Sequence, residues 1–93
     1  MLLITGSAIP LPEKRGQLIE AALEIASETK SDEGCLFYQF SEDLETGAII
    51  GVEIWLNQAA LDAHMNHPHT QKFMSGLDGV FAEAPIMTQT EIK

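Results

Sequence analysis

The sequence predicts an α+β fold in which a four-stranded antiparallel sheet carries its helices on one face. Four short segments have the density or alternation of apolar side chains that is typical of strands, and two regions of helical spacing separate them in the order β-α-β-β-α-β. The chain has 93 residues, and we expect residues 1–93 to form a single domain.

The first strand is predicted over Leu2–Ala8, a short apolar segment that ends before Pro10. A helix is predicted from Glu13 to about Lys30, where apolar side chains recur on one face. Pro12 suits the first turn of that helix, because its missing N–H would have no partner there in any residue. The sequence Ser31-Asp32-Glu33-Gly34 is a stop and turn signal.

The second strand is predicted over Cys35–Ser41, and the polar segment Glu42–Gly47 suits a hairpin loop. Simple alternation divides the side chains of this strand into two faces: Leu36, Tyr38 and Phe40 on one, and Cys35, Phe37 and Gln39 on the other. The third strand is predicted over Ala48–Leu56. Both of its faces are largely apolar, so we expect both to be covered.

Asn57 is a natural N-cap for a helix through about Met65. Pro68 predicts a break, after which a second helical piece turns Phe73, Leu77 and Val80 or Phe81 inward. The fourth strand is predicted over Ile86–Ile92. This order is the ferredoxin-like split unit. Because helices cover only one face of such a sheet, the apolar second face predicts a two-fold homodimer that packs sheet on sheet.

The composition limits the possible partners. The net charge is −9, with 14 acidic residues against 5 basic ones, so nucleic acid and an anionic membrane surface are unlikely partners on electrostatic grounds. The single cysteine, Cys35, cannot form an intrachain disulfide, which fits a cytoplasmic location. The sequence contains no signal-peptide pattern and no apolar run long enough to suggest a membrane span.

The candidate catalytic residues are Glu53, Trp55 and His64. Glu53 and Trp55 are two positions apart on a strand, so they share a face, and His64 lies on the inward face of the next helix with Leu61. An imidazole and a carboxylate in an apolar pocket make a general-base site. The alternative is structural: a core histidine bonded to a carbonyl, a packing tryptophan and a capping glutamate.

The remaining candidates for site chemistry are a metal, a nucleotide cofactor and the Tyr38 hydroxyl. The cluster of His64, His67 and His69 suggests a metal, but the break at Pro68 is expected to take His67 and His69 away from the face of His64, and no carboxylate completes a ligand spacing. No metal is therefore expected. The sequence has no glycine-rich phosphate loop, so no nucleotide cofactor is expected either. Tyr38 could donate a hydrogen bond to a bound oxygen atom.

Several segments together resemble the antibiotic biosynthesis monooxygenase family. They are Glu33-Gly34-Cys35-Leu36-Phe37-Tyr38, Glu53-Ile54-Trp55, Ala60-Leu61-Asp62-Ala63-His64 and His69 to Phe73, and the resemblance covers about residues 2 to 92. It implies a dimeric α+β barrel with a pocket between sheet and helices in each subunit. It also implies oxidation of quinols or polyketide aromatics without metal, flavin or haem.

In the scheme that the resemblance implies, His64 takes a phenolic proton, Trp55 stacks on the substrate ring, and Glu53 orients His64 or bonds to the substrate. Tyr38, Phe73 and Leu61 are the expected substrate contacts. The expected partners are a second copy of the chain, a small aromatic substrate and molecular oxygen, and no cofactor is expected.

Two branches of the family are disfavoured: haem degradation, because the first strand has no Asn, and phosphorylated autoinducer processing, because basic residues are scarce. The expected function is thus a cofactor-independent monooxygenase acting on a small quinol-like or polycyclic phenol. Two alternatives stay open. One is a non-catalytic small-molecule-binding or stress-response dimer, and the other is an isomerase or decarboxylase that uses His64 for acid–base chemistry.

Overall fold

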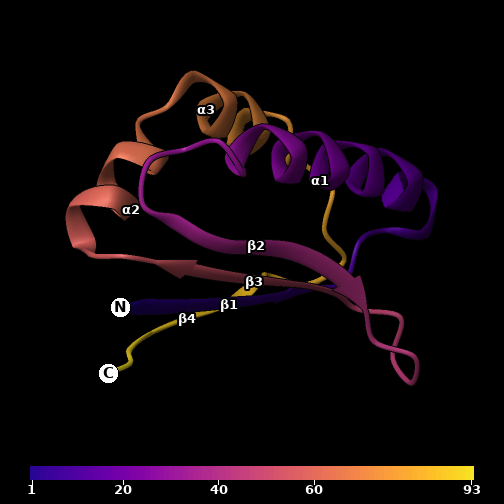
Figure 1. The fold of residues 1–93 in the computed structure, drawn as a ribbon. Helices are drawn as coiled ribbons and strands as arrows, with labels where there is room; N and C mark the ends of the chain where they lie inside the picture. Colours follow the sequence, from indigo (N-terminus) through magenta and orange to yellow (C-terminus); the bar gives the residue numbers. More distant parts are fainter.

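The computed structural model describes residues 1–93 and confirms the α+β architecture (Figure 1). The elements are β1 (Leu2–Ala8), the 3₁₀ turn η1 (Pro12–Lys14), α1 (Arg15–Thr29), β2 (Cys35–Glu42), β3 (Ile49–Trp55), α2 (Gln58–Met65), α3 (Pro68–Ser75) and β4 (Ile86–Glu91). The strands form one antiparallel sheet in the order β2-β3-β1-β4. In Figure 1 the helices lie together on one side of this sheet, and the two termini lie close together at one end of the strands. None of the helices has the length and hydropathy needed to cross a membrane.

Strand β2 departs from simple alternation at its start. Cys35 pairs with Trp55 and Phe37 pairs with Ile54, so Leu36 is an extra residue in a β-bulge. Cys35 consequently packs against the core on the helix side of the sheet, whereas Leu36 is 53% exposed. The prediction that Leu36 shares the inner face with Tyr38 is therefore wrong, because the bulge reverses the alternation before Phe37.

The main core lies between the sheet and the helices. It is built from Leu2, Ile4, Ile25, Tyr38, Trp55 and Leu61. A smaller cluster joins Leu18, Ile49 and Val80 near the other end of α1. Helix α3 ends at Ser75, so Val80 lies in the connection to β4 and not in a continued helix. Val80 is nevertheless buried as predicted, because this connection packs back onto the sheet.

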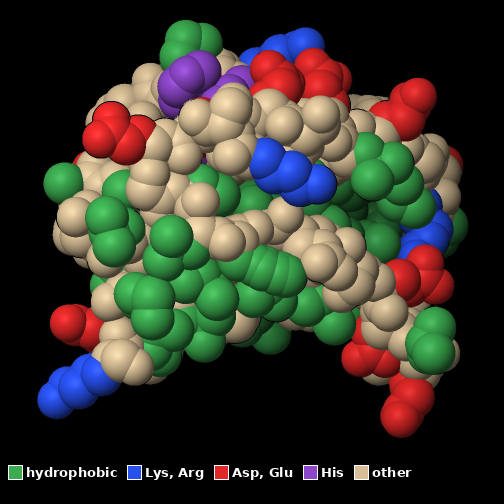
Figure 2. Space-filling view, in the orientation of Figure 1, with side chains coloured by type: hydrophobic (Ala, Val, Ile, Leu, Met, Phe, Trp, Pro, Cys, Tyr) green, Lys and Arg blue, Asp and Glu red, His purple; other side chains and the backbone are tan.

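The opposite face of the sheet is also apolar, as the sequence predicts. The strand registers place Leu3, Phe37, Val52 and Ile54 on this face, and each of these side chains is partly exposed in the single chain. Figure 2 shows hydrophobic side chains gathered in the lower half of the molecule, over the sheet, with acidic side chains mostly around its rim. The sheet thus has two apolar faces, of which the helices cover one.

The chain turns sharply from β3 into α2 and then into α3. The Ala60 N–H donates to Asn57 Oδ1 over 2.9 Å, which confirms Asn57 as the N-cap of α2. His67 caps α3, since its Nδ1 accepts from the His69 N–H over 3.3 Å, and Pro68 follows at the first helical position. The two caps fix where each short helix begins, and hence which way His64 and His69 point.

Candidate active site

A cavity of about 320 Å³ lies between the sheet and the helices. Its wall is mostly apolar and includes Ile25, Phe40, Phe73, Met74 and Met87. Tyr38, Glu53, His64 and Thr70 also line it, and these four polar side chains gather at one end. An apolar pocket with a few convergent polar groups is the usual form of a small-molecule site.

His64 is the central residue of the polar end. Its side chain is buried, because α2 packs its inward face against the sheet. Its Nδ1 lies 3.0 Å from Asp32 Oδ2, and the Thr70 hydroxyl lies 3.2 Å from Nδ1 and 3.4 Å from Nε2. A carboxylate only accepts, so Nδ1 donates to Asp32 and a neutral ring keeps Nε2 free to take a proton.

Trp55 supports His64 from the sheet side. The two ring centroids lie 4.6 Å apart, and the indole is completely buried. The indole Nε1 donates to Glu53 Oε1 over 2.9 Å. Trp55 is not part of the cavity wall, so its stacking on a substrate ring stays a prediction that this geometry does not support. Leu61 is likewise a core residue that does not line the cavity.

Glu53 and Tyr38 are cross-strand partners that face the cavity. Burial raises the pKa of the Glu53 carboxyl, and the Trp55 hydrogen bond and the charge of His64 oppose that shift. Burial also raises the pKa of the Tyr38 phenol, with a further contribution from the negative charge of Glu53. The phenol is therefore a hydrogen-bond donor at neutral pH and not a base.

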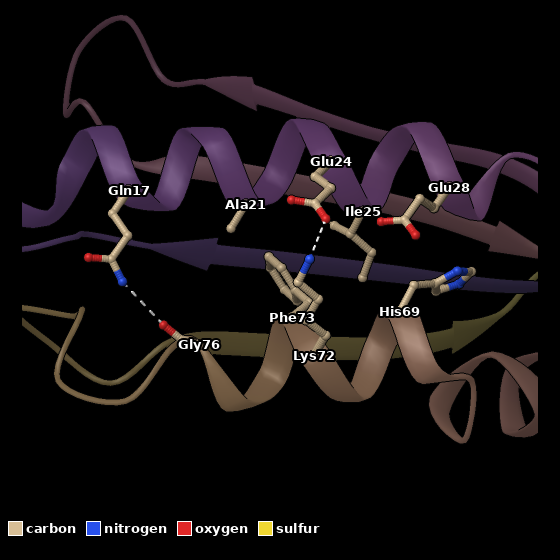
Figure 3. A pocket seen from close by; sticks show the side chains of 9 residues that line it. All are labelled: Gln17, Ala21, Glu24, Ile25, Glu28, His69, Lys72, Phe73 and Gly76. Atoms are coloured by element: carbon tan, nitrogen blue, oxygen red, sulfur yellow. Dashed lines mark hydrogen bonds and ion pairs between the residues drawn. The ribbon is translucent and has the colours of Figure 1, made fainter.

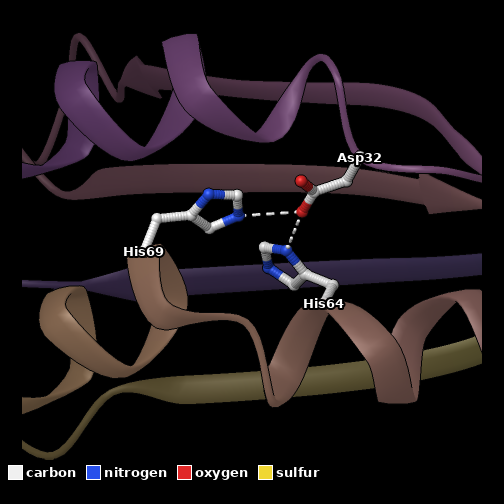
Figure 4. Close-up of side chains that lie close together, drawn as sticks. All are labelled: Asp32, His64 and His69. Carbon is white, nitrogen blue, oxygen red and sulfur yellow. Dashed lines mark hydrogen bonds and ion pairs between the residues drawn. The ribbon is translucent and has the colours of Figure 1, made fainter.

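Asp32 and His69 complete the site, and sequence reasoning missed both roles. Asp32 Oδ2 lies 2.8 Å from His69 Nε2 as well as 3.0 Å from His64 Nδ1 (Figure 4). The expectation that the Pro68 break separates His69 from His64 is wrong, since both rings point at one carboxylate. The carboxylate within hydrogen-bond distance of His64 is thus Asp32 and not Glu53. Its only signal in the sequence was a turn, so its 32-residue separation from His64 gave no indication of contact.

A groove runs between α1 and α3 and reaches His69 (Figure 3). An ion pair between Lys72 Nζ and Glu24 Oε1, 2.7 Å apart, bridges the groove. Ile25 and Phe73 line both this groove and the cavity, so they form the wall between the two. His69 therefore borders this groove, whereas His64 borders the cavity.

A profile of the antibiotic biosynthesis monooxygenase family matches residues 1–76. The chain belongs to this family. An uncharacterized protein of Synechocystis sp. is 30% identical over 74 residues, which are 78% of this chain and 50% of that protein. The chain therefore spans about half the length of this curated relative.

Two solved structures of similar fold extend the comparison. The protein Rv0793 of Mycobacterium tuberculosis superposes with a TM-score of 0.94 at 20% identity, over 99% of this chain and 94% of that one. A candidate antibiotic biosynthesis monooxygenase of Deinococcus radiodurans superposes with a TM-score of 0.91 at 27% identity, over 100% and 93%. The family fold is thus shared along the whole chain.

The family match ends at residue 76, so it includes the polar residues at one end of the cavity and the residues that contact His64 from outside it. Asp32, Glu53, Trp55, His64 and His69 all fall inside it. Strand β4 and the connection that precedes it fall outside, although Met87 of β4 contributes to the cavity wall. Within this family member, the acid–base groups and part of the apolar wall come from different parts of the chain.

Proposed function

We propose that this family member is a cofactor-independent monooxygenase that oxidises a small quinol-like or polycyclic phenolic substrate with molecular oxygen. The observation that carries the proposal is the cavity itself. It is apolar over most of its wall and holds one histidine oriented by a carboxylate at its polar end. This is what a phenol requires: a dry space for the ring and a base for its hydroxyl. The name of the similar Deinococcus radiodurans protein also supports it.

His64 is the proposed base. Asp32 accepts from Nδ1, which fixes the tautomer whose Nε2 is unprotonated and stabilises the ring once it is charged. Trp55 packs on the ring from the sheet side and limits its rotation. His64 would touch the substrate, whereas Asp32 and Trp55 act through His64 and are positioning residues.

The chemistry then depends mainly on the substrate. Proton transfer to His64 Nε2 leaves an electron-rich phenolate, which passes an electron to oxygen and then combines with the resulting superoxide to form a hydroperoxide. Loss of water from a CH–OOH centre leaves a carbonyl group. One oxygen atom enters the product and the other leaves as water, and the substrate supplies all four electrons for this reduction of oxygen, so no further reductant is needed.

Two more polar groups suit the same substrate. Tyr38 remains protonated and can donate a hydrogen bond to a substrate oxygen. Glu53 lines the cavity beside it, and its pKa is raised by burial. Phe73 supplies an aromatic part of the cavity wall and contacts Phe40. Tyr38 and Phe73 are the two expected substrate contacts that line the cavity.

The test is oxygen consumption with a panel of hydroquinones and anthrones in buffer that contains a chelator. We expect His64→Ala to lower the enzymatic rate by roughly 10²- to 10⁴-fold, the usual contribution of a general base. The matched control is His67→Asn, which removes an exposed imidazole outside the cavity while keeping a side chain able to cap α3. Its rate should equal that of the wild type.

Autoxidation of each substrate is subtracted from all rates. If His64→Ala consumes oxygen as fast as the wild type, His64 is not the base. If no substrate gives uptake above autoxidation, the oxygenase proposal fails for those classes. Asp32→Asn should lower the rate by roughly tenfold or more and alter its pH profile, because an amide can stabilise the wrong tautomer of His64.

One observation favours a second candidate function, an acid–base isomerase. A histidine base and a carboxylic acid with a raised pKa line the same cavity, and such a pair can remove a proton at one position and return it at another. Hydrogen–deuterium exchange into a phenol or enol without oxygen uptake would favour the isomerase. Oxygen uptake that is stoichiometric with substrate loss would favour the oxygenase.

We also propose that the protein works as a homodimer joined through the open face of the sheet. The partly exposed Leu3, Val52 and Ile54 on this face support sheet-on-sheet packing. Sedimentation of the wild type at micromolar concentration should give twice the mass of one chain. Val52→Lys should give one chain mass with unchanged circular dichroism, and a monomeric wild type would refute the proposal.

A further inference from the structure

Three ligand-type side chains from three segments converge on one point. Asp32 comes from the turn after α1, His64 from α2 and His69 from α3 (Figure 4). One ring nitrogen of each histidine and a carboxylate oxygen of Asp32 all lie within 4.8 Å of one another. The side chains of His64, His69 and Asp32 are only 2%, 6% and 10% exposed. The cluster is therefore built into the fold and is not a chance meeting of surface residues.

We propose that Asp32, His64 and His69 bind a first-row divalent cation such as Zn²⁺. Two imidazole nitrogens and one carboxylate oxygen are a ligand set that such cations favour. Bonds of about 2.1 Å at tetrahedral angles place ligand atoms roughly 3.4 Å apart. The two nitrogens now lie 3.0 and 2.8 Å from Asp32 Oδ2, so modest side-chain movement would make room for an ion.

The surroundings of the cluster suit a bound cation. A shallow pocket lined by Asp32, Glu33, His64 and His67 opens beside it and provides an entry path and room for a water ligand. A histidine ligand usually uses its second nitrogen as a hydrogen-bond donor, and the Thr70 hydroxyl lies 3.4 Å from His64 Nε2. The net charge of −9 also favours attraction of a cation.

The proposed ion lies on the outer side of His64. His64 lines both the cavity and the shallow pocket, whereas Asp32 lines the shallow pocket and is not part of the cavity wall. An ion held by Asp32 would therefore lie behind the imidazole and not among the groups that face a substrate. It would join the turn after α1 to α2 and α3. A cation on Nδ1 would leave the ring proton of His64 on Nε2, so the metal-bound protein would lack the free base proposed above, and the oxygenase would be the metal-free form.

The experiment uses tag-free protein that has been stripped with a chelator and exchanged into chelator-free buffer. Co²⁺ is titrated first, because its visible absorption reports coordination by nitrogen and oxygen, and Zn²⁺ is then added as a competitor. We expect one equivalent of Co²⁺ per chain and its displacement by Zn²⁺. Asp32→Asn and His69→Gln should each weaken binding by at least roughly tenfold, since loss of a ligand exceeds the effect of losing an outer-shell partner.

His67→Asn is the matched control. The His67 ring stacks on His69 with centroids 3.7 Å apart, but His67 is not one of the three converging residues. Binding by this variant should fall by clearly less than that of Asp32→Asn, because His67 lines the adjacent pocket and stacks on His69 but supplies none of the three ligands. If His67→Asn loses binding while Asp32→Asn keeps it, the ion is held by surface histidines and the proposal is wrong. Absence of stoichiometric binding by the wild type also overturns it.

A measurement on the wild type tests the proposed site even if the variants fail to fold. The chain has three histidines, so ring-nitrogen NMR spectra resolve each residue. Addition of Zn²⁺ should shift His64 Nδ1 and His69 Nε2 and leave His67 nearly unchanged. Spectra in which all three rings are insensitive to Zn²⁺, or in which His67 alone responds, would contradict the proposed site without any substitution.

Discussion

Replacement of Gly34 by Ala should test the contact between α2 and the turn after α1, which carries Asp32. Gly34 has a φ of +79°, a left-handed conformation that favours glycine. A methyl group added there would lie 2.5 Å from the Ala60 Cβ on α2. The substitution therefore combines backbone strain with a steric clash at the point where the turn that carries Asp32 meets the helix that carries His64.

The expected magnitude follows from these two terms. A left-handed backbone costs an L-residue about 1–2 kcal/mol relative to glycine. Overpacking in a close contact costs typically about 1–3 kcal/mol more. Gly34→Ala should thus lower the free energy of unfolding by about 2–5 kcal/mol. Gly47→Ala is a matched control, since its φ is +77° but its nearest neighbour, Arg15 Nη1, lies 3.9 Å away. It should lose only about 1–2 kcal/mol.

The assay is urea unfolding followed by the fluorescence of Trp55, the only tryptophan, at a fixed protein concentration. The double variant Gly34→Ala/Ala60→Gly removes the methyl group that causes the clash and should recover about 1–3 kcal/mol relative to the sum of the single changes. Equal destabilisation by Gly34→Ala and Gly47→Ala, together with no recovery in the double variant, would refute the contact between the turn and α2.

Three further predictions concern the groups around the cavity. Because burial raises the pKa of Glu53, this carboxyl contributes stability below its unfolded pKa, and that contribution is lost as the pH rises through the folded pKa. Urea unfolding from pH 5 to pH 8 should therefore show Glu53→Gln gaining stability relative to the wild type, whereas parallel profiles would contradict the shift. Tyr38 is the only tyrosine and its pKa is raised, so alkaline absorbance titration should show tyrosinate only as the protein unfolds. An ionised Tyr38 in folded protein near pH 10 would exclude its burial. Trp55→Phe leaves the partly buried Glu53 without its indole donor and removes part of a fully buried side chain, and urea unfolding followed by circular dichroism should show a loss of about 2–4 kcal/mol. A loss under about 1 kcal/mol would mean that the hydrogen bond contributes little.

Local sequence patterns were sufficient for most of the fold. The short apolar segment Leu2–Ala8 and the Asn57 cap were each predicted from a few neighbouring residues, and both agree with the structure. The sheet face on which Leu36 lies was predicted wrongly. A bulge depends on how a strand pairs with its neighbour, and the pattern of apolar residues in the strand itself does not reveal it. The end of α3 could not be placed from the sequence, because the apolar spacing of a helix continues to Val80. In the structure Val80 is buried, but it lies in an irregular segment after the helix.

The site was predictable only where its residues are close in sequence. Glu53, Trp55 and His64 were expected to meet because a strand runs directly into a helix, and the structure does bring them together. Whether each of these side chains faces the cavity or the core was not predictable. Whether an inward side chain reaches a cavity or fills the core depends on side-chain packing along the whole of α1 and α3, which no local spacing encodes. Trp55 therefore proved to be buried behind His64.

The convergence of His64 and His69 has a physical cause in the break between α2 and α3. On one uninterrupted helix, residues five positions apart project about 140° from each other, so the two rings could not reach the same carboxylate. The break at Pro68 was expected to separate the rings. Instead the chain turns there, α3 packs against α1, and His69 is brought back toward the turn that carries Asp32. Pro68, which argued against a site shared by His64 and His69, is therefore what allows both rings to reach Asp32. Both proposals, proton transfer by His64 and cation binding by the three residues, depend on this turn between α2 and α3.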